Sequence, residues 1–386
     1  MNRRMTPNMR LLLTVAMLTA AGLPRTAFAQ VTPAAGFTPP DDTPSIRVGT
    51  TIYPNFTYQT DPKITDSDGN QVNRNSFDVS RAYINVTGNI SHIIAFRVTP
   101  DITRETNPAS SLSGSLVFRV KYAFLQTNFD DWMTRGSWAR FGVQQTPYLD
   151  FEEGIYRYRF QGTMFVERAG YMSSADAGAS FHYNFKANYG DVHVGWYNGE
   201  NYNRAEVNDQ KGFQIRASAR PFARQKPVLR GLRATIFYTG DNYVKDAERK
   251  RTVFSLTYEH PYVVFGYEYL DVHDQRSALP GNPDVKGNGY SIWATPRSKW
   301  GWEALLRYDH LTPNASDAFA PLSTAGNLTT TLDSQQQNRG IVGVAYWFPH
   351  QGTVSTAIMA DYDWQIFKNL TADPVKTFAV HGLINF

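Results

Sequence analysis

The chain has 386 residues, of which 14% are aromatic and none is cysteine, so its fold is closed without disulfide bonds. The formal net charge of +4 disappears when an expected signal peptide removes four arginines and leaves 34 basic and 34 acidic residues. This balance gives no bulk electrostatic support to nucleic-acid binding. Beyond the N-terminal segment, no apolar stretch is long enough to span a membrane as a helix.

Residues 1–29 have the features of a secretory signal peptide. They combine a basic start, a short apolar stretch from Leu11 to Leu23, and the small-residue cleavage motif Ala27-Phe28-Ala29. The alternative is a buried N-terminal helix. Residues 30–45 are rich in proline and are expected to form an extended leader. We therefore expect the mature protein to work outside the cytoplasm.

From residue 46 to Phe386, apolar and polar residues alternate, which predicts β-strands with two different faces. In residues 114–128, for example, the alternation places Tyr122 and Phe124 on the apolar face with Leu116, and Lys121 on the other face. The sequence offers no convincing amphipathic helix of ordinary length. The predicted strands number sixteen: 46–60, 76–89, 92–101, 114–128, 137–147, 174–186, 190–198, 211–222, 229–241, 249–259, 262–272, 287–296, 300–311, 338–348, 353–366 and 375–386.

The connections between these strands alternate between short and long. Residues 90–91 and 260–261 form short connections, whereas 61–75, 148–173 and 312–337 are long. An antiparallel barrel with one tight rim and one rim of long loops has this rhythm, and bacterial outer-membrane barrels have an even number of strands. A soluble β-sandwich or a β-helix is the alternative, but a sandwich would not separate long and short connections so regularly.

The two strand faces support a membrane barrel. One face carries Arg, Lys, Glu and Asp at mid-strand, which is too much charge for a packed core. Lipid outside and water inside would satisfy both faces, and sixteen strands leave room for an aqueous channel. Aromatic residues near strand ends are expected to form girdles at the membrane interfaces: Phe56, Tyr58, Tyr267, Tyr269, Trp300, Trp302, Tyr346, Phe348, Tyr362 and Trp364.

Four segments resemble the phosphate-selective porins of the O and P type. They are FDVSRAYINVTGNI (77–90), RFGVQQTPYLDFEE (140–153), WYNGEN (196–201) and IRASARPF (215–222). The resemblance implies a homotrimer of sixteen-stranded barrels, each with its third long loop folded into the lumen. It also implies basic residues along the path of anions.

The chain ends in KTFAVHGLINF, a well-patterned strand with no tail. An unpaired strand edge in lipid is prohibitive, so this strand is expected to pair with the first one, near Ile46 to Tyr58. The terminal Phe386 resembles the signal that the barrel-assembly machinery reads in outer-membrane proteins. Phe378 and Ile384 fit the alternation of that signal, and Gly382 departs from it.

Segment 148–173 is the candidate constriction loop, because a loop of this length in a compact fold is unusual unless it is functional. The alternative is an extracellular flap with a solvated mixture of charges. Its charged residues are the candidate constriction residues: Asp150, Glu152, Glu153, Arg157, Arg159 and Arg168.

Strand parity predicts a basic wall in the lumen formed by the first nine strands. Arg216 and Arg220, four residues apart, would form two rungs of a ladder about 13 Å long. Glu259, Glu268, Glu303, Asp309, Asp361 and Asp363 would form a mostly acidic wall in the last seven strands, with Arg307 and Arg339 as exceptions. The candidate pore-lining, anion-binding residues are Arg47, Arg81, Arg97, Arg119, Lys121, Arg140, Arg216, Arg220 and Arg233.

A row of arginines and lysines in a narrow pore favours anions, because the low-dielectric wall focuses the field. These features predict a passive diffusion channel in the outer membrane of a Gram-negative bacterium, surrounded by lipid and preferring small anions such as phosphate. The alternatives are a non-selective porin, in which the arginines pair with acids, and a non-conducting structural or adhesive barrel.

An enzyme is not expected, because no nucleophile is placed with a base. Neither a cofactor nor a metal is expected. The eight histidines lack ligand spacing, and the DSDGN stretch (66–70) places its glycine too early for a calcium loop.

Overall fold

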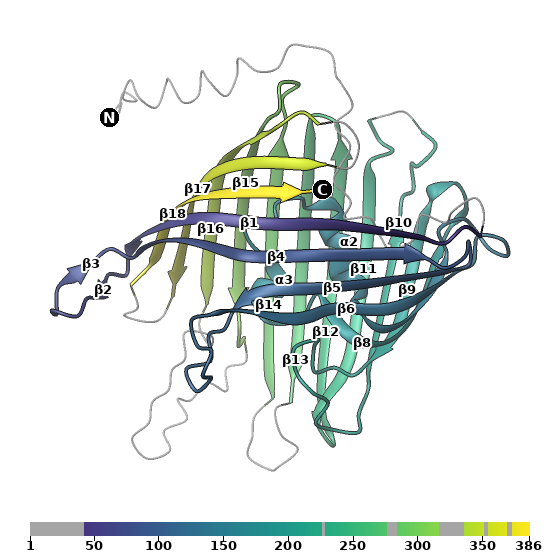
Figure 1. Cartoon of the computed structure of the whole chain (residues 1–386), viewed down its shortest axis with the longest axis horizontal. Coiled ribbons are helices and arrows are strands. Elements are labelled where there is room, and N and C mark those ends of the chain that lie inside the picture. The colour runs from purple at the N-terminus through teal and green to yellow at the C-terminus, as the bar shows by residue number, and fades with distance from the viewer. Residues whose placement is uncertain (1–41, 226–227, 276–283, 316–335, 351–353, 369–372) are drawn as a thin grey trace.

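Sixteen antiparallel strands close into a barrel in the computed structural model, which confirms the predicted fold class (Figure 1). The structure describes residues 42–225, 228–275, 284–315, 336–350, 354–368 and 373–386. The expected signal peptide, residues 1–29, and residues 30–41 of the expected leader lie outside this range. Each barrel strand pairs with the strands before and after it in the chain, and β1 pairs with β18.

The observed strands lie within a few residues of those predicted from alternation. A small hairpin, β2 (Ile64–Thr65) with β3 (Gln71–Val72), extends from the connection after β1, and η1 (Lys186–Asn188) is a single 3-10 turn. The barrel strands are β1 (Ser45–Asp61), β4 (Asn75–Asn89), β5 (Ile94–Arg104), β6 (Leu116–Asn128), β7 (Trp138–Gln145), β8 (Ala175–Asn184), β9 (Gly190–Tyr197), β10 (Gly212–Ala219), β11 (Leu232–Val244), β12 (Ala247–His260), β13 (Val263–Asp274), β14 (Val285–Pro296), β15 (Trp302–Thr312), β16 (Gln337–Trp347), β17 (Ser355–Phe367) and β18 (Val375–Asn385).

The last strand closes the barrel against the first, as predicted. Ile384 lies opposite Ile52, and Phe378 lies opposite Tyr58. The backbone of Phe386 continues the ladder, because its N–H donates to the carbonyl oxygen of Thr50 at 3.1 Å and its own carbonyl accepts from Thr50 at 3.0 Å. The final residue is therefore part of the wall.

The neighbouring strand explains why Gly382 departs from the apolar alternation. A Cβ atom at Gly382 would lie 2.8 Å from Cγ of Pro54 on β1, which is closer than carbon atoms tolerate. The ring of Pro54 thus fills the outward position that a side chain at Gly382 would occupy.

The outer face of the barrel is apolar and the inner face is charged. Leu306, Val344 and Ile358 point outward and are exposed. Aromatic side chains are also exposed at the two ends of the strands, with Trp302 and Phe348 near one rim and Phe77 near the other. This outer surface matches a hydrocarbon environment flanked by aromatic belts.

One predicted strand face is wrong. Tyr122 and Phe124 are buried inside the barrel, although the alternation had placed them on the lipid face. The cause is a β-bulge, because Thr99 pairs with Tyr122 while Pro100 pairs with Val120, which leaves Lys121 as the extra residue. A bulge shifts the inward and outward sets by one residue. Lys121 and Tyr122 both face the lumen as a result.

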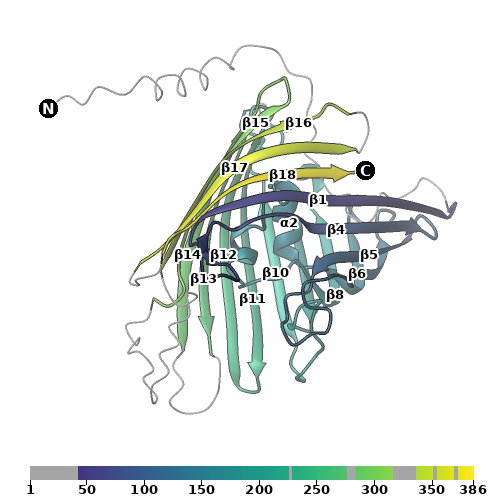
Figure 2. The same cartoon turned by 60° about the vertical axis from the view of Figure 1, so that its left-hand side comes forward.

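The long connection after β7 folds into the barrel and contains two helices, α2 (Pro147–Ile155) and α3 (Phe165–Arg168). Figures 1 and 2 both show α2 inside the wall. Neither helix was predicted. Among the described residues, no helix combines the length and the apolar composition that crossing a membrane would require. The rim that carries the long loops also has a short connection, because only residues 245–246 separate β11 from β12.

Candidate functional site: the lumen constriction

Helix α2 starts at a recognisable sequence signal. Thr146 is its N-cap residue and Pro147 occupies the first turn, where proline is favoured because its missing N–H would be unpaired anyway. The Oγ1 atom of Thr146 donates to the carbonyl oxygen of Ser173 at 2.6 Å. This bond ties together the two ends of the constriction loop, so the loop leaves and rejoins the wall at one place.

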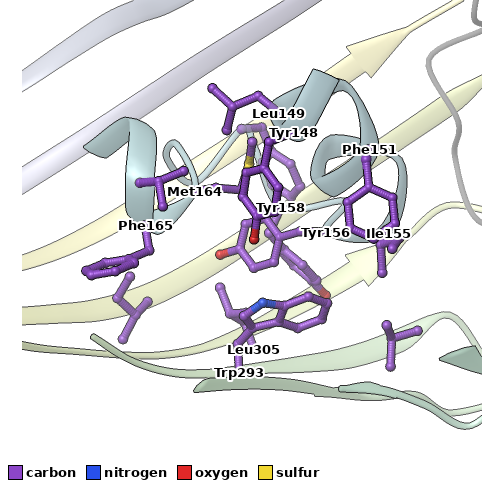
Figure 3. Close-up of a cluster of buried hydrophobic side chains, with 14 of the residues drawn as sticks. Tyr148, Leu149, Phe151, Ile155, Tyr156, Tyr158, Met164, Phe165, Trp293 and Leu305 are labelled. Atoms are coloured by element: carbon purple, nitrogen blue, oxygen red, sulfur yellow. The ribbon is translucent and has the colours of Figure 1, made fainter. Parts of the chain in front are cut away.

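An apolar cluster holds the loop against the wall from β11 through β18 to β1 and β4 (Figure 3). The ring of Tyr156 meets Trp293 edge-on at a centroid distance of 5.0 Å, and Tyr148 lies 5.5 Å from Phe237. Buried aromatic residues contribute large areas to such a cluster. The tip of the loop also reaches β1, where Phe160 lies 6.5 Å from Tyr53, and a pocket remains between the loop and the wall of β1, β4, β5 and β6.

Buried ion pairs fix the tip of the loop. Arg157 forms an ion pair with Glu303 on β15, and Arg297 binds the same carboxylate at 3.1 Å. Further along the loop, the guanidinium of Arg307 donates to the carbonyl oxygen of Thr163 at 3.1 Å. Removing one partner of a buried pair leaves an uncompensated charge, so these contacts resist detachment of the loop.

A second contact between loop and wall involves a buried carboxyl group. Tyr148 donates to Oε2 of Glu268 on β13 at 2.9 Å, and the buried Glu152 on α2 lies close enough to interact electrostatically with Glu268. Burial, and then the charge of Glu268, raise the pKa of Glu152 well above its usual range. Glu152 is therefore protonated over a wider pH range than an exposed glutamate.

We expect the thermal stability of the protein to fall as pH rises through the raised pKa of Glu152. The folded-state pKa lies above the unfolded one, so the stabilisation is complete at low pH and is lost on ionisation. Between about pH 5 and pH 9, where buried glutamates ionise, the Tm of Glu152→Gln should change less than that of the parent. Glu248→Gln, at an exposed carboxylate, is the control. Equal slopes for all three proteins would contradict the prediction.

The other charged loop residues also have partners. Arg159 binds Glu153 at 3.1 Å and pairs with Glu167. Asp150 lies 3.6 Å from Arg140 on β7, and Arg168 lies 4.0 Å from Asp363 on β17. The six candidate constriction residues thus all belong to the in-folded loop, and three of them, Asp150, Arg157 and Arg168, lie in ion-pair range of the wall.

Most of the candidate basic residues in the wall are paired with acids. Asp101 bridges Arg81 at 2.7 Å and Arg119 at 2.9 Å. Glu259 lies 3.1 Å from Arg233 and 3.8 Å from Arg220. These pairs join neighbouring strands and reduce the field that a row of free arginines would create.

Arg216, the first residue of the expected basic ladder, is also neutralised by an acid. Arg216 forms an ion pair with Asp191 on β9 and donates to the carbonyl oxygen of Pro147 at 3.0 Å. Asp101 and Asp191 lie in the half of the barrel that was predicted to be basic, so the expected separation into one basic and one acidic wall is incomplete.

Two basic side chains at the constriction have no carboxylate partner among the described residues. Arg97 is 3% exposed and donates to Thr99 at 2.9 Å and to Asn85 at 2.8 Å, while its Nη1 atom has no protein acceptor. Lys121 is 2% exposed and lies 3.4 Å from the hydroxyl of Tyr83. Their charges are uncompensated by direct pairing. Arg47, by contrast, is exposed near the start of β1.

Sequence reasoning missed the residues that complete this arrangement. Asp191 has the lumen-facing parity within its predicted strand, so the alternation alone could have found it. Tyr122 could not be found in this way, because the bulge that turns it inward has no signal in the alternation. Glu167, which binds Arg159, lies in a short helix that was not predicted.

No family model matches the chain, and no curated protein matches it. Solved structures do match. A form of the Vibrio cholerae outer membrane protein OmpT lacking loop L8 has a TM-score of 0.57 at 14% identity, covering 89% of this chain and 100% of that one. The fold is that of the outer-membrane porins.

Two further porin-fold structures agree. The outer membrane channel DcaP of Acinetobacter baumannii has a TM-score of 0.56 at 9% identity, covering 92% of this chain and all of that one. An anion-selective porin from Comamonas acidovorans has a TM-score of 0.57 at 13% identity, covering 89% and 100%. At such low identity the likeness establishes the porin fold and does not extend to the solute.

Proposed function

We propose that the protein is a passive diffusion channel for small hydrophilic solutes in the outer membrane of a Gram-negative bacterium, with a preference for anions such as phosphate. The observation that carries the preference is the pair Arg97 and Lys121, buried at the constriction without a carboxylate partner among the described residues. Anions gain from both charges where the passage is narrowest, and a low-dielectric wall strengthens the effect.

The surface of the barrel supports placement in a membrane. Large apolar side chains are exposed around the outside, and such a surface would be unfavourable in water. The terminal Phe386 completes the β1–β18 ladder and keeps its side chain exposed on the outside, where the barrel-assembly machinery could contact it. Export by the signal peptide at residues 1–29 belongs to the same proposal.

A homotrimer is the proposed assembly. OmpT of Vibrio cholerae, in its trimer form, has a TM-score of 0.54 at 13% identity and covers 89% of this chain. Cross-linking of the purified protein in detergent, followed by mass measurement, would test the assembly.

The test of the proposed function is the reversal potential of the protein in a planar lipid bilayer under a KCl gradient. If the channel prefers anions, the reversal potential should have the same sign as the equilibrium potential of chloride. A reversal potential of the opposite sign would overturn the anion preference, although the protein would still be a channel. A reversal potential near zero would favour the non-selective porin. The abundant ion pairs of the wall support this second candidate. Absence of any conductance would favour a structural or adhesive barrel.

A further inference from the structure

A pocket lies between the tip of the constriction loop and the wall formed by β1, β4, β5, β6 and β18. The rings that line it come from both sides, with Phe160 on the loop and Tyr53, Tyr83 and Tyr122 on the wall. A solute that passes the constriction on this side meets these residues.

The charge inside the pocket is positive. Four cationic residues and one carboxylate line it. Glu303 neutralises Arg157, and Arg159 binds both Glu153, the lining carboxylate, and Glu167. Arg97 and Lys121 form no direct ion pair among the described residues, although Glu153 and Glu167 act electrostatically on Lys121, and the Nη1 atom of Arg97 is buried without a protein acceptor. An unpartnered buried donor favours an anionic acceptor, because leaving it unsatisfied is costly.

The aromatic residues lie next to these cations and to one another. The guanidinium of Arg97 lies 4.5 Å from the ring centre of Tyr122, and the ammonium of Lys121 lies 4.9 Å from that of Tyr83. Tyr53 lies 6.1 Å from Tyr83 and 6.5 Å from Phe160. The two cations and the four rings therefore form one continuous surface.

We propose that this pocket is a binding site for organic anions that carry an aromatic ring and a single carboxylate. The carboxylate accepts hydrogen bonds from Arg97 and Lys121, and the ring packs against Phe160 and Tyr53. This assignment rests on the proposed function and names the class of solute that the channel retains longest.

The composition of the pocket favours such an anion over inorganic phosphate. Phosphate is surrounded by oxygen atoms and needs donors on every side, whereas the pocket places aromatic rings and Leu383 among its polar residues, which include Thr51, Asn85 and Asn385. Burying polar oxygens against carbon without hydrogen bonds is unfavourable. A planar ring gains from offset or edge contacts with Phe160 and Tyr53 instead.

The test compares three probes on the purified full-length mature protein in a planar bilayer. Benzoate, acetate and inorganic phosphate are added separately to KCl, and the block of the chloride current is measured against concentration. Benzoate should block at concentrations about three- to tenfold lower than acetate, which is the effect expected of one or two aromatic contacts. Equal block by benzoate and acetate, or stronger block by phosphate, would overturn the assignment.

Two variants test whether the rings of the pocket cause the difference between benzoate and acetate. Phe160→Leu and Tyr53→Leu should each reduce the benzoate-to-acetate ratio while the reversal potential in KCl stays anion-selective. Phe141→Leu is the matched control, because Phe141 is exposed on the outer face of β7. An unchanged ratio in both pocket variants would refute the site while the proposed channel stands. A wild-type protein without conductance or anion preference would refute the proposed function itself.

Discussion

Replacing Arg97 and Lys121 together by methionine is expected to remove most of the preference for anions. A unit charge about 7 Å from a passing ion in water contributes about 0.6 kcal/mol, which is about threefold in permeability. Each charge attracts chloride and repels potassium by this amount, so two charges account for about 2.4 kcal/mol, or about fiftyfold, in the permeability ratio of chloride to potassium. The measurement is the reversal potential in a KCl gradient.

The matched control for this pair is Arg104→Met with Lys376→Met. These residues lie at the long-loop rim and are more exposed, and they pair with Asp78 and Asp61. The control makes the same change in net charge away from the constriction, where salt screens exposed charges. A similar loss of preference in both double variants would show that net charge, and not its position, sets selectivity.

Glu303→Gln is expected to loosen the constriction loop. The substitution leaves Arg157 and Arg297 buried without their shared carboxylate. Breaking a buried pair costs about 3–5 kcal/mol, so the tip of the loop should leave the wall. Trypsin should then cut the folded barrel after Arg157 or Arg159, and the single-channel conductance should rise. In the parent protein, where the loop stays against the wall, we expect neither the tryptic cleavage nor the higher conductance.

Glu259→Gln is the control for loop release. Glu259 also joins two arginines, Arg220 and Arg233, but both lie outside the loop. It should leave the loop protected from trypsin. Cleavage to the same extent in the two variants would point to general loosening of the barrel, and protection in both would show that the apolar cluster alone holds the loop.

Alternation was sufficient to predict the barrel because each strand must present one face to lipid and the other to water. That requirement acts on every second residue, so sixteen strands and the pairing of Phe378 with the first strand were all readable from sequence. The length of the loop marked it as functional, and its in-folding was expected from the resemblance to the phosphate-selective porins. The strand features depend on local composition.

The lumen contacts were less predictable because they depend on register and on single irregularities. The pairing of Arg216 with Asp191 requires the alignment of β9 with β10, which alternation does not give. The inward turn of Tyr122 depends on one extra residue at Lys121. Helix α2 does have a signal in Thr146-Pro147, but its short length hides any periodicity.

The proposed solute path is built partly from the two ends of the chain. Thr51 on β1 donates to Oδ1 of Asn385 on β18 at 2.6 Å, across a sequence separation of 334 residues, and both residues line the aromatic pocket. Bringing such distant residues together carries a cost in loop-closure entropy, and non-local pairing slows folding. The passage is complete only when this seam is closed. A barrel whose last seam is still open has no complete passage, so conductance would report on closure as well as on transport.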